Sequence, residues 1–444
     1  MTAPVPRLPA AGRAVPAGPG SPAEPAGQTE PAGSAFDGAA LARIALTWLA
    51  EPGTWSVYWL VRRLGPVEAL SRLLDGEFID DRVRSAVAAR LALGDPRRVA
   101  AEAAEHTVRL GARLITPDDE EWPTRLVDLE QLARRPAERR VDQETAPPLC
   151  LWVRGATPLS EAVDRSVAVV GSRAATPYGT HVATDIAFGL AERDWTVVSG
   201  GAFGIDAAAH RGALTAGGLT VAFLACGVDR PYPVGNTALF DRIAETGLLV
   251  SEWLPGSAPL RPRFLIRNRL IAAATVGTVL VEAAARSGAT QTFGRALALH
   301  RPAMVVPGPV TSAMSVGAHE MLRLHREARL VTGLPQVLEE VGRIGADLAP
   351  VPRGTSHPRD RLDDDAAQVL EALPRRGTLD VETLAARAGV DFRTVLRKVS
   401  LLEDLGLLVR RDSGYALPPA ARRRPSPMGS PPTGGSPPAT GAPP

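Results

Sequence analysis

The stretch RPRFLIRNR, residues 261–269, places four arginines around one phenylalanine with no acidic residue among them. Guanidinium groups bind phosphate oxygens, and an aromatic ring offers a face on which a nucleobase can stack. The residues of this stretch that could hold a single-stranded nucleic acid are Arg261, Arg263, Phe264, Arg267, Asn268 and Arg269. An alternative remains open, in which Phe264 begins a buried helix and the last two arginines pair with a carboxylate. The candidate carboxylates are Glu252 and Glu282.

A second basic motif is the loop GSR, which directly follows the apolar run SVAVV. Glycine permits a tight turn, and Thr176-Pro177 predicts a helix start whose free N–H groups attract anions. The arginine adds further donors, so the loop could bind a phosphate; the alternative is a simple turn with a solvated arginine. The residues of this candidate site are Gly171, Ser172 and Arg173.

Two further loops carry glycine and serine at the expected ends of strands. In SGGAFGID we expect Asp206 to cap the next helix, where its carboxylate competes with phosphate for the same N–H groups, and His210 to be packed rather than catalytic. VEAAARSGAT places a serine and a glycine where another helix opens. The candidate residues of the two loops are Ser199, Gly200, Gly201, Ser287 and Gly288. Because no G-x-G-x-x-G follows a strand, a nicotinamide cofactor is not indicated, and we expect no cofactor, metal or catalytic residue.

These loops need a scaffold, and the sequence predicts one. Short β-branched runs alternate with helix-length segments: SVAVVG, TVVSGG, TVAFLA, LLVSEW, GTVLVEA and PAMVVPG. Continuous apolar strands separated by helices are typical of a parallel sheet covered on both faces. We therefore predict an α/β domain, a Rossmann-like doubly wound parallel sheet, over residues 151–340. Its ligands would gather at the carboxyl ends of the strands.

The rest of the chain divides around this domain. The predicted parts are a disordered Pro/Ala/Gly tail (1–35), a small helical domain (36–95), a connecting segment (96–150), a linker (341–362), a winged-helix domain (363–418) and a second disordered tail (419–444). In the winged-helix segment, two helices flank a glycine-containing turn and precede a hairpin at Asp412-Ser413-Gly414.

Composition limits the function classes. The 444 residues hold 50 Lys+Arg and 48 Asp+Glu, so anion binding must come from a local cluster of arginines rather than from net charge. The two cysteines form no metal-ligand or disulfide pattern, and no segment has the length of a membrane helix or the core of a signal peptide. We expect a cytoplasmic protein without a membrane partner.

The motifs VAVVGSR, SGGAFGIDAAAH, YPVGN, LLVSEW, FLIRNRLIAA, VEAAARSG and VVPGPV occur in the order and spacing of a known family. Residues 165–333 resemble the DNA-processing protein A family, called DprA or Smf. The helical segment is similar to the sterile-alpha or helix-hairpin-helix module of that family, and the last segment to its winged helix. The resemblance implies a non-enzymatic protein that binds and protects incoming single-stranded DNA, loads the RecA recombinase during natural transformation, and dimerises through the Rossmann-like domain.

The chain departs from the family pattern at Phe293-Gly294, His319 and Arg326-Glu327. Two other functions stay open. A nucleotide hydrolase similar to the LOG phosphoribohydrolases needs a glutamate in the helix that opens at Gly288, but no Asp or Glu occurs from Ala283 to His319. A transcription regulator would read duplex DNA with the winged helix.

Overall fold

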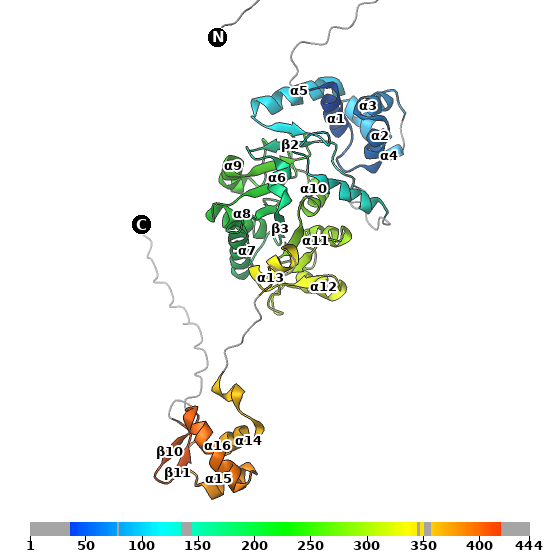
Figure 1. Cartoon of the computed structure of the whole chain (residues 1–444). Coiled ribbons are helices and arrows are strands. Elements are labelled where there is room, and N and C mark those ends of the chain that lie inside the picture. Colours follow the sequence, from blue (N-terminus) through cyan, green and yellow to red (C-terminus); the bar gives the residue numbers. More distant parts are fainter. Residues whose placement is uncertain (1–35, 78–79, 135–143, 344–346, 350–356, 419–444) are drawn as a thin grey trace, which may run out of the picture. The chain divides into compact units, whose positions relative to one another are not determined.

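The computed structural model describes residues 36–77, 80–134, 144–343, 347–349 and 357–418 (Figure 1). The chain forms two compact units, Met1–Ala349 and Pro350–Pro444. The two predicted disordered tails, residues 1–35 and 419–444, lie outside the described residues. Within the described residues, no helix combines the length and the apolar character needed to cross a bilayer.

The larger unit is built on a nine-stranded sheet with the order β1-β2-β6-β5-β4-β3-β7-β8-β9. The strands are β1 (Arg113–Ile115), β2 (Leu151–Arg154), β3 (Ser166–Val170), β4 (Thr196–Ser199), β5 (Thr220–Leu224), β6 (Leu248–Ser251), β7 (Gly277–Leu280), β8 (Ala303–Val305) and β9 (Arg329–Leu330). In this order, every neighbouring pair from β6 through β5, β4, β3, β7 and β8 to β9 is parallel. Strands β1 and β2 pair antiparallel and form one edge of the sheet. The six predicted strands are β3 to β8, and the predicted α/β, Rossmann-like class is confirmed.

The strand order reverses at β3. The chain runs from β3 through β4 and β5 to β6 on one side, then returns to place β7, β8 and β9 on the other side. The connections that follow β3 and β7 therefore leave the sheet toward opposite faces. A crevice opens between such connections in doubly wound sheets, and ligands bind there.

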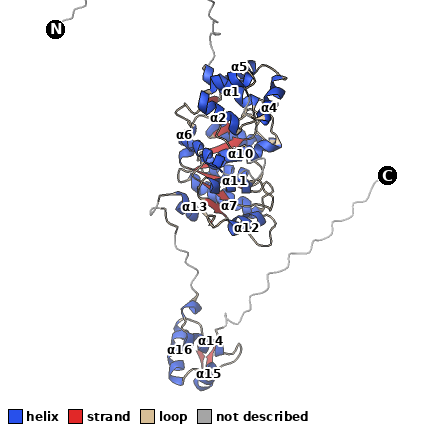
Figure 2. Cartoon of the chain, turned by 90° about the vertical axis from the view of Figure 1, so that its right-hand side faces the viewer, coloured by secondary structure: helices blue, strands red, loops and turns tan. Residues whose placement is uncertain are grey.

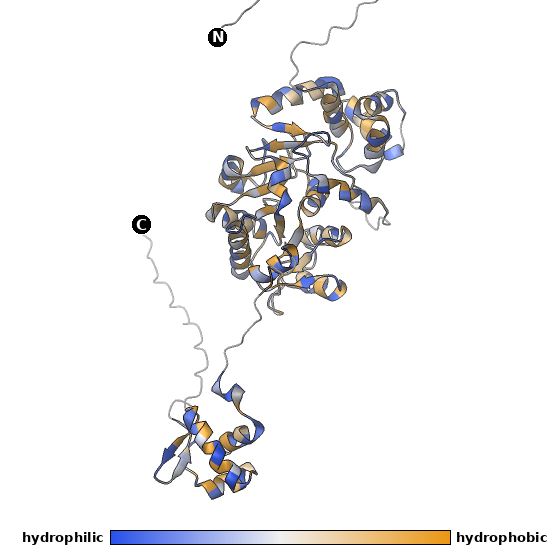
Figure 3. Cartoon of the chain, in the orientation of Figure 1, coloured by the Kyte–Doolittle hydropathy of each residue, from blue (hydrophilic) through white to orange (hydrophobic). Residues whose placement is uncertain are grey.

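Helices cover both faces of this sheet (Figures 1 and 2). One face carries α7 (Pro177–Ala191), α8 (Ile205–Thr215), α9 (Thr237–Thr246) and α13 (Leu334–Val341). The other carries α6 (Leu159–Asp164), α10 (Arg261–Ala274), α11 (Ala289–Ala298) and α12 (Val316–Leu324). Successive residues of β3 show the alternation, because Val167 packs toward α7 and α8 while Ala168 packs toward α10. The central strands are accordingly rich in hydrophobic residues (Figure 3).

Among the described residues, five helices precede β1: α1 (Gly38–Leu49), α2 (Trp55–Leu64), α3 (Pro66–Leu74), α4 (Asp81–Leu91) and α5 (Pro96–Arg109). They share one hydrophobic core with Trp152 of β2. The sequence predicts a connecting segment over residues 96–150. The structure differs, because this segment contains α5, β1 and the 3-10 helix η1 (Thr124–Arg134). The buried residues of α5 include Ala100, Ala103 and Ala104, whose small side chains give a weak hydrophobic pattern.

The smaller unit contains η4 (Pro358–Arg361), α14 (Asp364–Ala372), α15 (Val381–Ala388), α16 (Phe392–Asp404), β10 (Val409–Arg411) and β11 (Gly414–Ala416). The side chains of Asp363, Asp380 and Asp391 cap the three α-helices by accepting N–H bonds from the first turn. Arg411 pairs with Gly414 across a two-residue turn, so the predicted hairpin is confirmed. The helix α14, which precedes the predicted pair of helices, completes the core.

Candidate functional site

A cleft of about 1310 Å³ lies where the strand order reverses. It is lined by the loop after β3, the loop after β7 and the first turns of α10. Nine of the predicted site residues line it: Gly171, Ser172, Arg173, Arg261, Phe264, Arg267, Asn268, Ser287 and Gly288. The structure thus brings three separate motifs of the sequence to one concave surface.

The cleft is strongly basic. Arg173, Arg261 and Arg286 line it with exposed side chains, and no carboxylate of the described residues pairs with any of the three. The acidic residue of the lining, Asp206, is buried. Unpaired guanidinium groups around a concave surface concentrate positive potential there, which favours a polyanionic ligand.

Phe264 offers an aromatic face inside this basic surface. Its side chain is half-buried, and the guanidinium carbon of Arg173 lies 4.9 Å from the ring centroid. The ring of Tyr232 meets it edge to face, with centroids 5.8 Å apart. These neighbours orient the Phe264 ring without enclosing it, so a planar group can stack where phosphates can also be bound.

Arg267 supplies a fixed charge at the base of the cleft. Its guanidinium donates to the carbonyl of Gly200 at 2.9 Å and to the carbonyl of Phe223. The side chain is only 3% exposed, so direct contact with a ligand is limited to the surface that lines the cleft. Burial lowers the pKa of Arg267 to about 10, and the group therefore stays protonated at neutral pH.

In the loop after β4, a buried carboxylate already accepts from a backbone N–H group that an anion would need. The carboxylate of Asp206 folds back and accepts from the backbone N–H of Ala202 at 3.4 Å, whereas the N-cap of α8 is Gly204. Asp206 thus stabilises the loop and does not cap its own helix as predicted, but it still takes the place that a phosphate would need. Burial raises its pKa, an effect that Arg267 opposes.

Three predicted residues of this loop, Ser199, Gly200 and Gly201, do not line the cleft. The Ser199 hydroxyl is fully buried and donates to the carbonyl of Val169 at 2.7 Å. The predicted packed role of His210 is confirmed, because it is fully buried, its Nδ1 lies 2.7 Å from the Thr220 hydroxyl, and burial lowers its pKa to about 3.

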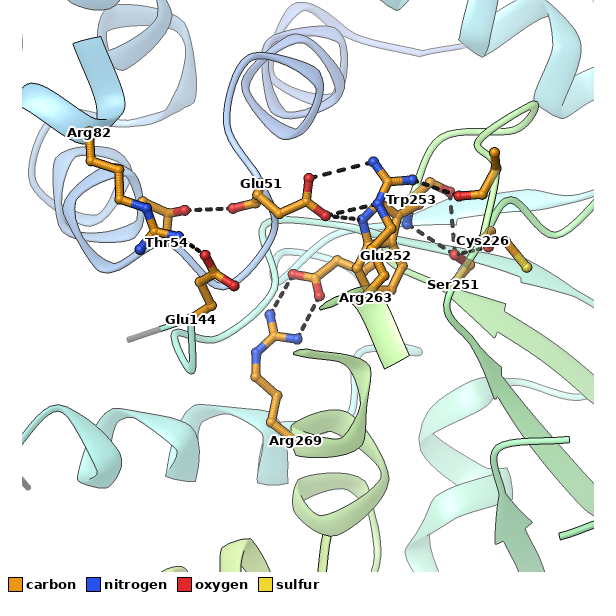
Figure 4. A network of polar contacts seen from close by, with 11 residues as sticks. Glu51, Thr54, Arg82, Glu144, Cys226, Ser251, Glu252, Trp253, Arg263 and Arg269 are labelled. Carbon is orange, nitrogen blue, oxygen red and sulfur yellow. Dashed lines mark hydrogen bonds and ion pairs between the residues drawn. The ribbon is translucent and has the colours of Figure 1, made fainter. Parts of the chain in front are cut away.

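Arg263 and Arg269 do not line the cleft. Their guanidinium groups pair with carboxylates instead, which argues against their predicted role as phosphate ligands (Figure 4). Arg269 forms two hydrogen bonds of 2.7 Å with the Glu252 carboxylate, and both side chains are buried. Arg263 donates to Glu51 at 2.9 Å and lies over the Trp253 ring. Of the two pairings left open in the sequence, that of Arg269 with Glu252 is confirmed.

The reason lies in helical geometry. All of residues 261–269 belong to α10, and the residues of α10 that line the cleft are Arg261, Phe264, Leu265, Arg267, Asn268 and Ile271. Residues three and four apart share a helix face, so this set forms one stripe. Arg263 and Arg269 fall to either side of that stripe. The sequence prediction grouped all four arginines and so did not separate Arg263 and Arg269 from the two that line the cleft.

The Glu282 carboxylate is also held by hydrogen bonds within the protein. Its carboxylate accepts from the backbone N–H of Thr176 at 2.9 Å and from the Thr176 hydroxyl at 2.6 Å. Its carbonyl accepts from the N–H of Ser172 at 2.7 Å. Glu282 therefore joins the loop after β7 to the loop after β3 and fixes the geometry of the cleft.

The sequence reasoning missed Arg286, which directly precedes the predicted Ser287 and lines the cleft. Its position in the loop after β7 was the available signal. Asn268 donates to the carbonyl of Gly288 at 3.3 Å and so joins α10 to that loop. Two departures from the family pattern are accommodated, because Phe293 is buried in the core and His319 Nε2 lies 3.1 Å from the Gly308 carbonyl.

Known proteins are similar to this chain over the residues that form the sheet and the cleft. The family described as DNA recombination-mediator protein A matches residues 113–342, which include the whole nine-stranded sheet. A putative DNA processing protein DprA of Mycobacterium tuberculosis is 45% identical over 381 residues, covering 86% of this chain and 95% of that protein. The chain belongs to the DNA recombination-mediator protein A family.

A further member of the family is found in Streptococcus pneumoniae. DNA processing protein DprA of Streptococcus pneumoniae is 41% identical over 174 residues, which cover 39% of this chain and 61% of that protein. Its crystal structure superposes with a TM-score of 0.55 and 28% identity, covering 69% of this chain and 99% of that one. The fold of the larger unit is therefore similar to that of the Streptococcus pneumoniae protein.

Proposed function

We propose that the protein binds single-stranded DNA in the cleft and acts as a recombination mediator. The carrying observation is the Phe264 ring, half-exposed and flanked by Arg173, on a surface where Arg173, Arg261 and Arg286 have no carboxylate partner among the described residues. Sequence-independent binding of single strands combines such a basic groove with aromatic stacking platforms. Unpaired bases can reach the Phe264 ring, whereas the bases of a duplex are already stacked on each other.

A binding role rather than catalysis is supported by the state of the nearby acids. Glu252 pairs with Arg269, Glu282 holds Thr176, and Asp206 stabilises its own loop. A general acid or base has to reach the reacting group. These three carboxylates are occupied by structural contacts, so a phosphoribohydrolase mechanism gains no support from them.

The role in the cell follows from family membership. We propose that the protein protects DNA entering the cytoplasm during natural transformation and loads the RecA recombinase onto it. The smaller unit would be a winged helix, with α15 and α16 as the helix-turn-helix and β10–β11 as the wing. A homodimer through the Rossmann-like domain is supported by Leu324 and Leu330, which are exposed near the β9 edge of the sheet.

The first test compares strand types. We expect the full-length protein to bind an oligothymidine more tightly than a duplex of matched length, and its affinity to fall steeply with salt because phosphate contacts release counterions. The measurement is fluorescence anisotropy with labelled oligonucleotides at four salt concentrations. Equal or tighter binding of the duplex would favour the transcription-regulator alternative.

The second test separates charge from stacking in the cleft. Arg173→Ala and Arg286→Ala should each flatten the salt dependence by about one unit of slope, because each removes about one phosphate contact. Phe264→Ala should leave the slope unchanged and cost roughly 1–3 kcal/mol of binding free energy. The same titrations measure both effects.

The control for this series is Arg242→Ala, because Arg242 is exposed on α9, pairs with Glu245 and does not line the cleft. Its salt slope should match that of the unmodified protein. If Arg173→Ala and Arg286→Ala also match it, the phosphates lie elsewhere and the proposed function loses its site.

A further inference from the structure

Two exposed aromatic side chains lie beyond Phe264 on the carboxyl edge of the sheet. Phe203, in the loop after β4, is 49% exposed, and Tyr232, in the loop after β5, is 43% exposed. Large apolar side chains are normally buried, so exposure of this size needs a reason. Neither residue is needed to fill the hydrophobic clusters of the unit.

The two loops are joined to each other. The Asn236 side chain, itself buried, donates to the carbonyl of Gly201 at 3.0 Å. The Phe203 ring packs against Gly235, where a Cβ atom would come within 3.0 Å of it. Because β4 and β5 are adjacent parallel strands, both loops leave the sheet at the same edge. The aromatic side chains are thus presented by a connected pair of loops.

This edge is continuous with the cleft. Tyr232 lines the cleft and contacts the Phe264 ring, and Ala202, the neighbour of Phe203, also lines it. Arg230 is exposed beside Tyr232 and donates to a backbone carbonyl of Gly256 rather than to a carboxylate, so a further basic side chain lies next to Tyr232. Exposed aromatic side chains therefore extend from Phe264 through Tyr232 to the adjoining loop that carries Phe203.

We propose that a DNA strand bound in the cleft continues over the carboxyl edge of β4 and β5, where Tyr232 and Phe203 each stack one further base. The inference rests on the proposed function, since it extends the same bound strand. Phe203 is the outer end of this extension and Tyr232 the link to the cleft. Stacking is tolerant of sequence, so the extension raises affinity without base preference.

The test is the dependence of affinity on oligonucleotide length. Oligothymidines from about 4 to about 16 nucleotides, the range of comparable binding sites, are titrated against full-length protein. Phe203→Ala should leave the affinity for the shortest oligonucleotides unchanged and weaken the binding of longer ones by about 5- to 150-fold, the loss expected for one stacked base. Phe203→Trp, which keeps an aromatic face, should restore the affinity for long oligonucleotides.

A matched control is Trp59→Ala, because Trp59 is 45% exposed, belongs to α2 and does not line the cleft. It should behave as the unmodified protein at every length. A second readout uses oligonucleotides with 2-aminopurine at successive positions. Phe203→Ala should change the bound-state emission at one position near an end of the bound segment, whereas a merely structural role would change none selectively.

Several results would overturn the inference. Unchanged affinity of Phe203→Ala at all lengths would mean that the exposed ring serves another partner, such as a protein. Equal weakening at all lengths would mean that Phe203 only supports the cleft. These outcomes differ from failure of the proposed function, in which Arg173→Ala and Phe264→Ala would leave binding intact at every length.

Discussion

Arg269→Ala is expected to lower the free energy of unfolding of the larger unit by about 3–5 kcal/mol, the usual result of removing one partner of a buried ion pair. The Arg269 guanidinium is fully buried, and its loss leaves the Glu252 carboxylate without its two 2.7 Å hydrogen bonds. It also removes the donor to the Ala146 carbonyl at 2.8 Å. Urea denaturation followed by circular dichroism measures the change.

A double variant distinguishes pairing from simple loss of volume. Arg269→Met combined with Glu252→Leu removes both charges and should recover part of the stability that either single change loses. Arg261→Ala, on the same helix but exposed in the cleft, is the control and should change stability little while weakening DNA binding. A stability of Arg269→Ala equal to that of Arg261→Ala would contradict the pairing.

Gly204→Ala is expected to destabilise the fold by about 3 kcal/mol and to reduce affinity for single-stranded DNA at least about tenfold, since backbone strain of this kind costs about 1–3 kcal/mol before any displacement. Gly204 has φ +77° and ψ −125°, and a Cβ atom there would lie 2.2 Å from the carbonyl oxygen of Ser172. The loop after β3 must move to make room. That loop carries Arg173, so the change disturbs the cleft directly.

The control for backbone strain is Gly217→Ala. Gly217 also has a positive φ, +73°, but a Cβ atom added there would meet no other atom within 4 Å. The substitution should cost only the left-handed conformation, about 1–2 kcal/mol, and leave DNA binding unchanged. Comparable loss of binding in both variants would show that general instability, not loop displacement, is responsible.

The sequence predicted the parallel sheet well because its strands are continuous apolar runs, which few other structures tolerate. It did not predict β1 and β9, which have three and two residues and lie at the sheet edges. Such short strands form because an existing edge offers hydrogen-bond partners. Their own residues carry little signal, as the exposed pair Arg329–Leu330 illustrates.

For the site, the sequence predicted most of the residue types that line the cleft, but not the directions in which the side chains of α10 point. The loops GSR and RSG reach the cleft as expected because strand ends fix their position. The arginines of residues 261–269 required the start of α10 to be known, since helical spacing sends Arg261 to the cleft and Arg269 to Glu252. The carboxylates that pair with Arg263 and Arg269 are Glu51 and Glu252, which lie in distant parts of the sequence.

The contacts of Arg263 and Arg269 make α10 a shared element of two parts of the molecule. Through Glu51, Arg263 is tied to the segment between α1 and α2 (Figure 4). Through the Ala146 carbonyl, Arg269 is tied to the chain that leads into β2. The opposite side of the same helix carries Phe264 and the cleft. The N-terminal helices therefore support the helix that carries the binding surface. Their removal would perturb the cleft although none of their residues lines it.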